Sequence, residues 1–266
     1  MLQLNDIDFS GFVGREEGLK KIGRYYIYMP MFYRPSVYFH SRKLFCLLRQ
    51  ALFDIQNKLD KNFDFDRTLI MALVHDDAEM IIGDIQASFR PKMSQAELKN
   101  ADQAEIAATE SLAKKFPQKI NGYNYQELLL EIFKRNTLAS QVVKYLDHLD
   151  AHNEALHELY AGNTAFTINI INEYGKLPLP TEFYPPRFNN YKDFYPLLAN
   201  IIGERVPFLK NFEKVNHQKI AASGRPHTKN SLKINTNDPI YEWWKNTIIK
   251  GLGEEAIQEL TTIKES

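Results

Sequence analysis

Apolar residues recur at helical spacing along most of this chain, and one long pattern covers residues 36–58. Its inward face comprises His40, Leu44, Leu47, Leu48, Ala51 and Ile55, so the histidine is expected to point inward. The next pattern, residues 66–82, is apolar on every side of its first turns and predicts one central, buried helix. Gly83 suits the end of that helix, because glycine enters the left-handed conformation without a steric cost.

Seven further segments are predicted to be helical. They cover residues 15–26, 94–116, 125–134, 138–160, 165–174, 191–216 and 238–264. Ser94 and Glu97 have the spacing of a capping box at the start of the second of these. No segment alternates with a period of two, so the expected fold class is all-α, a helical bundle.

Composition changes at Gly175, where the segment GKLPLPTEFYPPRFNN introduces four prolines. Proline-rich segments of this kind are typical of boundaries. We therefore expect a first domain over residues 1–175 and a helical C-terminal extension over 176–266. The extension contains a basic loop around Arg225, which is expected to be surface rather than a phosphate-binding site. Its Trp243 and Trp244 indicate docking by aromatic burial, onto the first domain or onto a second subunit.

Charge and cysteine content narrow the possible partners and location. Lys+Arg and Asp+Glu both number 33, so no global field favours nucleic acid or an anionic membrane. The single cysteine, Cys46, excludes an internal disulfide and a thiolate metal cluster, and fits a reducing compartment. No apolar run approaches the roughly 18 residues of a membrane span, and the N-terminus lacks the pattern of a signal peptide. We expect a cytoplasmic protein without a membrane, DNA or RNA partner.

Candidate chemistry is concentrated in LIMALVHDDAEMIIGD, residues 69–84, where an apolar run is followed by a histidine and four acids. Buried acids are costly unless a positive charge offsets them, and a bound cation would do so. Two histidines and two aspartates could form one site: His40, His75, Asp76 and Asp147. Two imidazoles and two carboxylates suit Mn, Co, Ni, Fe or Zn better than Mg.

Several of these residues have alternative explanations. Asp147 could instead pair with Lys144 at i,i+3, and Asp150 is a rival ligand on nearly the same helical face. His148 and His152 are i,i+4 neighbours, but HLDAH lacks the glutamate of a zincin motif. A structural or solvent-exposed role is therefore expected for that histidine pair.

Two further features of the sequence remain open between a structural and a functional role. Asp77 is expected to cap a helix or to face solvent. The aromatic loop between Tyr25 and Tyr33 could stack on a nucleobase, or could belong to the core and to a dimer surface.

The pattern H…HD…D on an all-α chain resembles the HD-domain metal-dependent phosphohydrolases, and within them the YfbR-like 5′-deoxynucleotidases. The resemblance covers about residues 19–166. It includes SVYFHS around His40, ALVHDDAEMIIGD in the middle, and VKYLD followed at similar spacing by LYAGN. Other branches of the superfamily hold two metals through extra histidines between the HD pair and the last aspartate. This chain has no His or Cys between Asp76 and Asp147, which favours a single divalent ion.

The resemblance also implies a role for each site residue. The metal ligands would be His40, His75, Asp76 and Asp147. Glu79 would be the catalytic carboxylate, Arg24 a contact to the substrate phosphate with Tyr25 beside it, and Asp84 a ligand for the sugar hydroxyl.

The function implied by the resemblance is release of phosphate from (deoxy)nucleoside 5′-monophosphates by a homodimeric 5′-nucleotidase. Two alternatives remain open. One is a nucleoside triphosphate phosphohydrolase with the same metal site, and the other is a non-catalytic nucleotide sensor.

Overall fold

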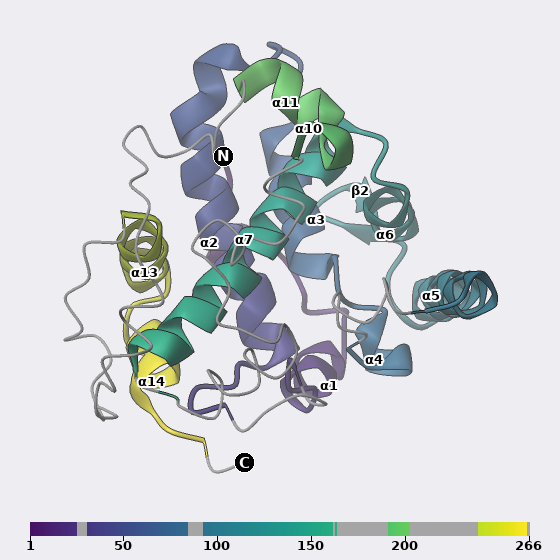
Figure 1. Ribbon diagram of the computed structural model, residues 1–266. Helices are drawn as coiled ribbons and strands as arrows, with labels where there is room; N and C mark the ends of the chain where they lie inside the picture. The colour runs from purple at the N-terminus through teal and green to yellow at the C-terminus, as the bar shows by residue number, and fades with distance from the viewer. Residues whose placement is uncertain (26–30, 85–92, 162, 164–190, 203–238, 265–266) are drawn as a thin grey trace.

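The computed structural model describes residues 1–25, 31–84, 93–161, 163, 191–202 and 239–264, and these are mostly helical (Figure 1). The expected all-α class is confirmed. The helix predicted at 165–174, the proline-rich boundary and the basic loop around Arg225 lie outside the described residues.

Three helices form the centre of the fold: α2 (Val37–Ile55), α3 (Phe65–Val74) and α7 (Leu138–Tyr160), each in contact with the other two. Ser36 and Asp64 begin α2 and α3, because each side chain accepts a hydrogen bond from the backbone N–H three residues later. Figure 1 shows α7 crossing α2, with α13 on one flank of the pair and α5 and α6 on the other. His40 is fully buried on α2, as its position in the apolar pattern predicted.

The prediction of one helix over residues 66–82 is wrong. Helix α3 ends at Val74, residues 75–78 form a turn, and α4 (Glu79–Ile82) follows. Within the turn the N–H of Asp77 bonds to the carbonyl of Val74 at 3.0 Å, an i→i−3 contact that is tighter than α-helical bonding. The His75 side chain contributes to the break, because its Nδ1 bonds to the Ala72 carbonyl at 2.8 Å. Gly83 ends α4 with a φ of 75°, as expected.

The remaining helices within residues 1–161 follow the predictions more closely. Helix α5 (Gln95–Lys115) begins with the predicted Ser94–Glu97 capping box, and α6 (Tyr125–Lys134) and α7 have the predicted bounds. Helix α1 (Arg15–Lys20) is shorter than predicted, because the chain leaves the helix to form a β-bridge between Gly23 and Ser36. Short 3-10 turns lie at Leu4–Asp6 and Gln56–Lys58.

A small hairpin was not predicted. Strands β1 (Lys119–Ile120) and β2 (Tyr123–Asn124) pair antiparallel, with Ile120 opposite Tyr123. The two connecting residues, Asn121 and Gly122, both have positive φ angles. An Asn-Gly pair is the sequence signal for this type of turn, so the hairpin could have been predicted from it.

Both helices predicted in the C-terminal part of the chain are divided. Within residues 191–202 the first is divided into α10 (Tyr191–Phe194) and α11 (Pro196–Ile202), because proline lacks the N–H needed to continue a helix, and its predicted remainder, 203–216, lies outside the described residues. The second becomes α13 (Pro239–Leu252) and α14 (Glu254–Thr261), separated by Gly253 with a φ of 58°. None of the helices in the described part of the chain is both long and apolar enough to cross a bilayer.

Helix α13 packs against α2 and α7, and its aromatic residues Tyr241 and Trp244 are fully buried there. The contact with α2 is close, since a Cβ added to Gly251 would lie 2.4 Å from the Cys46 sulfur. Helices α13 and α14 therefore share a hydrophobic cluster with α2 and α7.

Candidate active site

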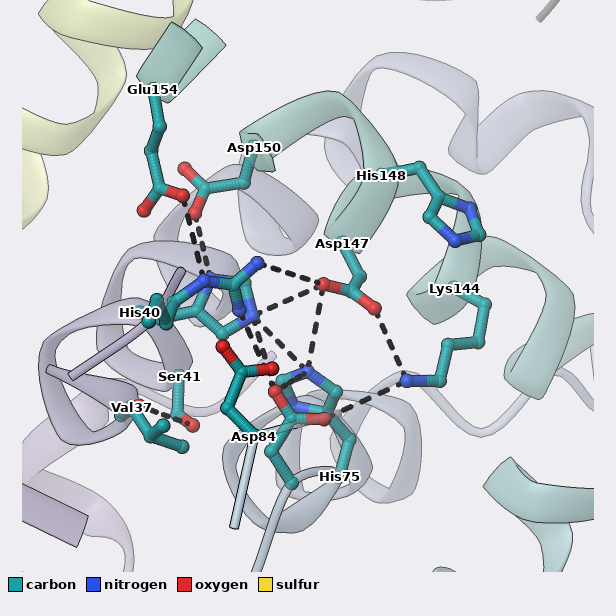
Figure 2. A network of polar contacts seen from close by, with 12 residues as sticks. Val37, His40, Ser41, His75, Asp84, Lys144, Asp147, His148, Asp150 and Glu154 are labelled. Atoms are coloured by element: carbon teal, nitrogen blue, oxygen red, sulfur yellow. Dashed lines mark hydrogen bonds and ion pairs between the residues drawn. The ribbon is translucent and has the colours of Figure 1, made fainter. Parts of the chain in front are cut away.

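The structure brings the four predicted ligands together from three elements: His40 from α2, His75 and Asp76 from the turn after α3, and Asp147 from α7. One ligand atom of each lies within 4.8 Å of the others. The Nε2 atoms of His40 and His75 are 3.2 Å apart, and His40 Nε2 is 3.1 Å from Asp147 Oδ1. Figure 2 shows His40, His75 and Asp147 directed towards one centre.

The outer nitrogens of the two histidines determine how their rings are presented. His40 Nδ1 lies 2.7 Å from Asp150 Oδ2, and His75 Nδ1 lies 2.8 Å from the Ala72 carbonyl. A carboxylate and a carbonyl can only accept, so each Nδ1 carries a proton and Nε2 is the nitrogen of each ring that faces inward, where its lone pair is the one available to a metal ion. Two imidazole lone pairs and two carboxylates thus converge, a donor set that fits a borderline divalent metal ion.

The pKa values of the cluster also indicate that its carboxylates favour a neighbouring positive charge. Burial alone would lower the pKa of His75, but Asp76 and Asp147 raise it to about 9. Burial alone would raise the pKa of Asp147, but Lys144 and the two imidazoles hold it well below its ordinary value. A proton on His75 Nε2, close to Asp76 and Asp147, thus supplies positive charge where a bound cation would otherwise supply it.

Two basic side chains lie beside the ligand carboxylates. Arg24 Nη1 is 3.6 Å from Asp76 Oδ2, and its Nη2 is 3.8 Å from Asp147 Oδ1. Lys144 Nζ is 3.1 Å from Asp147 Oδ2 and 3.6 Å from Asp76 Oδ1. The Lys144–Asp147 ion pair therefore exists, yet it does not remove Asp147 from the cluster. Lys144 was not among the predicted site residues, although its i,i+3 spacing to Asp147 was visible in the sequence.

Asp150, the rival ligand, lies on the far side of His40 from the centre of the cluster. It bonds to Nδ1 rather than Nε2 of that ring, and Lys43 Nζ lies 2.9 Å from its Oδ2. Lys43 also bonds to Glu154. His40, Asp150 and Glu154 form a second group of potential ligands, but in that group the ammonium of Lys43 already supplies positive charge to both acids.

Glu79 and Asp84 contribute two more carboxyl groups near the cluster. Among the described residues, Glu79 Oε2 has no hydrogen-bond partner although that atom is buried. Burial, together with the charges of Asp76 and Asp84, raises the pKa of Glu79 well above its ordinary value. Asp84 Oδ2 accepts a hydrogen bond from the backbone N–H of Tyr25 at 2.9 Å. The environment of Glu79 thus favours the protonated form of its carboxyl group over the charged form.

Tyr25 adopts a left-handed backbone conformation with a φ of 58°, which is costly for a tyrosine and is a common feature of functional sites. Its hydroxyl donates to Glu154 Oε2 at 2.7 Å and lies 3.3 Å from Arg24 Nη2. Of the aromatic loop that follows, residues 26–30 lie outside the described residues, and Tyr33 is buried.

The expectation that Asp77 caps a helix or faces solvent is wrong. Its side chain is 1% exposed, and both carboxylate oxygens accept hydrogen bonds from Arg15 at 2.7 Å. The Tyr125 hydroxyl donates to Oδ2 at 2.7 Å. His148 bonds to the Tyr195 hydroxyl and His152 is buried, and neither belongs to the group of four ligands.

Comparison with known proteins identifies the family to which this chain belongs. The family model described as 5′-deoxynucleotidase YfbR-like matches residues 12–176, which include every site residue named above. No protein with a curated description matches the chain. Chains of solved structures do match. One of them, a conserved hypothetical protein from Pyrococcus furiosus, is 24% identical over 53% of this chain and 76% of that chain, with a TM-score of 0.40. The chain belongs to the YfbR-like 5′-deoxynucleotidase family, a family of the HD-domain type.

Proposed function

We propose that this protein is a mononuclear metal-dependent phosphohydrolase that releases phosphate from (deoxy)nucleoside 5′-monophosphates. The observation that carries the proposal is the convergence of two imidazole nitrogens and two carboxylates within 4.8 Å, inside the region that the family model covers. The ion would be held by His40, His75, Asp76 and Asp147. This mixed set suits Mn, Co, Ni, Fe or Zn.

When bound, such an ion polarises a phosphate oxygen and lowers the pKa of a coordinated water. The chain supplies the remaining functions. Arg24 and Lys144 place two positive charges beside the ligand carboxylates, where they would balance the charge of the phosphoryl oxygens. An ion bound to Asp76 would weaken the attraction of that carboxylate for both basic groups and leave them available to the substrate.

Glu79 is the group best suited to proton transfer. Burial and the neighbouring carboxylates raise its pKa, which favours a carboxyl proton that would be donated to the leaving nucleoside oxygen. One oxygen of Asp84 is bonded to the backbone of Tyr25, and the other oxygen would accept a hydrogen bond from a sugar hydroxyl.

A phosphate-release screen tests this function. Nucleoside mono-, di- and triphosphates would be assayed with Mn²⁺, Co²⁺, Ni²⁺, Zn²⁺ and Mg²⁺, with His75→Ala as the control. We expect release of inorganic phosphate from monophosphates with a transition metal, and none from the variant. Selective hydrolysis of triphosphates would replace the proposed substrate class, and no turnover of any nucleotide would favour a sensor.

A further inference from the structure

Trp244 of α13 connects the C-terminal extension to the candidate metal centre. The residue lies outside the region that the family model matches, which ends at residue 176. Its indole is fully buried, and Nε1 donates a hydrogen bond to Asp150 Oδ1 at 2.5 Å. The other oxygen of the same carboxylate accepts from His40 Nδ1 at 2.7 Å. A continuous chain of hydrogen bonds therefore runs from the extension to a predicted metal ligand.

The carboxylate of Asp150 determines how His40 is presented. Because it accepts the proton on Nδ1, it leaves the lone pair of Nε2 for the centre of the cluster, where His75 Nε2 lies 3.2 Å away. Partners of this kind orient ligand histidines and increase their basicity in metalloproteins. The orientation of Asp150 itself depends on Trp244 and on Lys43, whose Nζ lies 3.1 Å from Oδ1.

We propose that Trp244 is a positioning residue of the metal centre, which fixes His40 through Asp150, so that the extension completes the site rather than forming an independent module. This inference rests on the proposed function, because it requires His40 to be a metal ligand.

The packing of α13 does not require the hydrogen bond from the Trp244 indole N–H. Helix α13 is also held by the close contact of Gly251 with Cys46 and by the Tyr241 hydroxyl, which bonds to His157 Nδ1 at 2.7 Å. A phenylalanine at position 244 would preserve most of the buried apolar surface. It would leave Asp150 Oδ1 with Lys43, which also bonds to Glu154.

The first test compares Trp244→Phe with Tyr241→Phe in the full-length protein. Each substitution removes one buried hydrogen bond between α13 and α7, but only the first of these bonds leads to His40. Calorimetric titration of the metal-free proteins with Mn²⁺ should show affinity about 10- to 100-fold weaker for Trp244→Phe, and close to wild type for Tyr241→Phe. Equal losses in both variants would assign the effect to loosening of α13 and overturn the inference.

A double-mutant cycle with Asp150→Asn tests whether Trp244 acts through Asp150. The losses of Mn²⁺ affinity should be clearly less than additive, because the second substitution removes a link that is already broken. Additive losses would show that Trp244 acts independently of Asp150, which contradicts the proposed connection.

A third test uses the wild-type protein and does not depend on whether a variant folds. The chain has two tryptophans, so its ¹⁵N spectrum contains two indole signals. Addition of Zn²⁺ should shift the Trp244 signal and leave that of Trp243 nearly unchanged. If Zn²⁺ binds and neither signal moves, the inference about Trp244 is wrong while the metal site stands. If the wild-type protein binds no divalent ion, the proposed function and this inference fail together.

Discussion

Asp76 and Asp77 are adjacent in one buried turn, yet their surroundings differ in kind. Both oxygens of Asp77 accept hydrogen bonds from Arg15, and one also accepts from Tyr125. Asp76 instead lies 2.9 Å from His75 Nε2, and the basic groups near it are at 3.6 Å. One carboxylate is neutralised by partners within the fold, whereas the other belongs to a set of acceptors that converge on a common point.

The difference separates a structural charge from a ligand site. A buried ion pair with good geometry and further hydrogen bonds holds a fixed conformation, and removing one partner is strongly destabilising. The Asp77 cluster thus fixes the turn between α3 and α4. That turn presents His75 and Asp76 to the centre of the site, as a preorganised metal centre requires.

The largest expected effect is on catalytic turnover, from a substitution of Glu79 near Asp76. Glu79→Gln should lower turnover by roughly 10²- to 10⁴-fold, because it keeps the shape of the side chain and removes the proton. Metal and nucleotide affinities should be retained, which binding titrations of the same variant would check. If Glu79→Gln and Glu79→Ala both hydrolyse substrate at the wild-type rate, Glu79 is structural.

Asp77→Ala should lower the free energy of unfolding by about 3–5 kcal/mol, because it leaves the buried guanidinium of Arg15 without its counter-ion. Asp76→Ala is the matched control, since it removes the neighbouring carboxylate from the same turn. Urea denaturation with EDTA present would compare the two variants. The loss for Asp76→Ala should be much smaller, and equal losses would contradict the distinction between the two sides of the turn.

A buried histidine elsewhere on α7 gives the unfolding free energy a pH dependence of its own. His157 packs against Tyr33, Tyr241 and Trp244, and burial lowers its pKa from 6.5 to about 3. The unfolded chain therefore binds the proton first as the pH falls. The stabilisation is complete above about pH 6.5 and is lost as the pH falls towards 3, by about 1.4 kcal/mol per pH unit.

Unfolding free energies of wild type and His157→Gln between about pH 6 and 4 would test that pH dependence. Glutamine does not titrate in this range, so the wild-type curve should be steeper by the stated amount. Parallel curves would show that His157 does not remain neutral in the folded state.

Tyr125→Phe is expected to have the smallest effect, a loss of about 1–2 kcal/mol in unfolding free energy, because Asp77 keeps both bonds from Arg15. The substitution removes only the hydroxyl that donates to Asp77. Chemical denaturation measures the loss, and Tyr123→Phe on the adjacent hairpin is a control whose hydroxyl bonds to an exposed carboxylate. A loss as large as that of Asp77→Ala would mean that the tyrosine, rather than the arginine, holds the turn.

Local patterns in the sequence were sufficient for much of the fold. The apolar spacing of α6 and α7 gave both of their bounds, and Ser94 with Glu97 gave the start of α5. Breaks caused by tertiary contacts were not predicted. The turn at residues 75–78 includes Asp77, which bonds to Arg15 at a separation of 62 residues, and no local pattern contains that contact.

The candidate site was predictable to a similar degree. The sequence pattern suggested the four ligands, and the family resemblance implied the same set. The structure brings them together, while their role in binding a metal stays a prediction. Asp147, Asp150 and Glu154 share a helical face at i, i+3 and i+7, so the position of the latter two near His40 could have been expected. The bond from Trp244 to Asp150 spans 94 residues and required the tertiary structure.

The central claim is that His40, His75, Asp76 and Asp147 hold one divalent ion. The most direct measurement is the metal content per chain, determined by elemental analysis after saturation with Mn²⁺ and removal of excess ion. The comparison is between the wild-type protein and the double variant His75→Ala/Asp76→Ala. We predict one ion per wild-type chain and none in the variant. Full occupancy in the double variant would contradict the site.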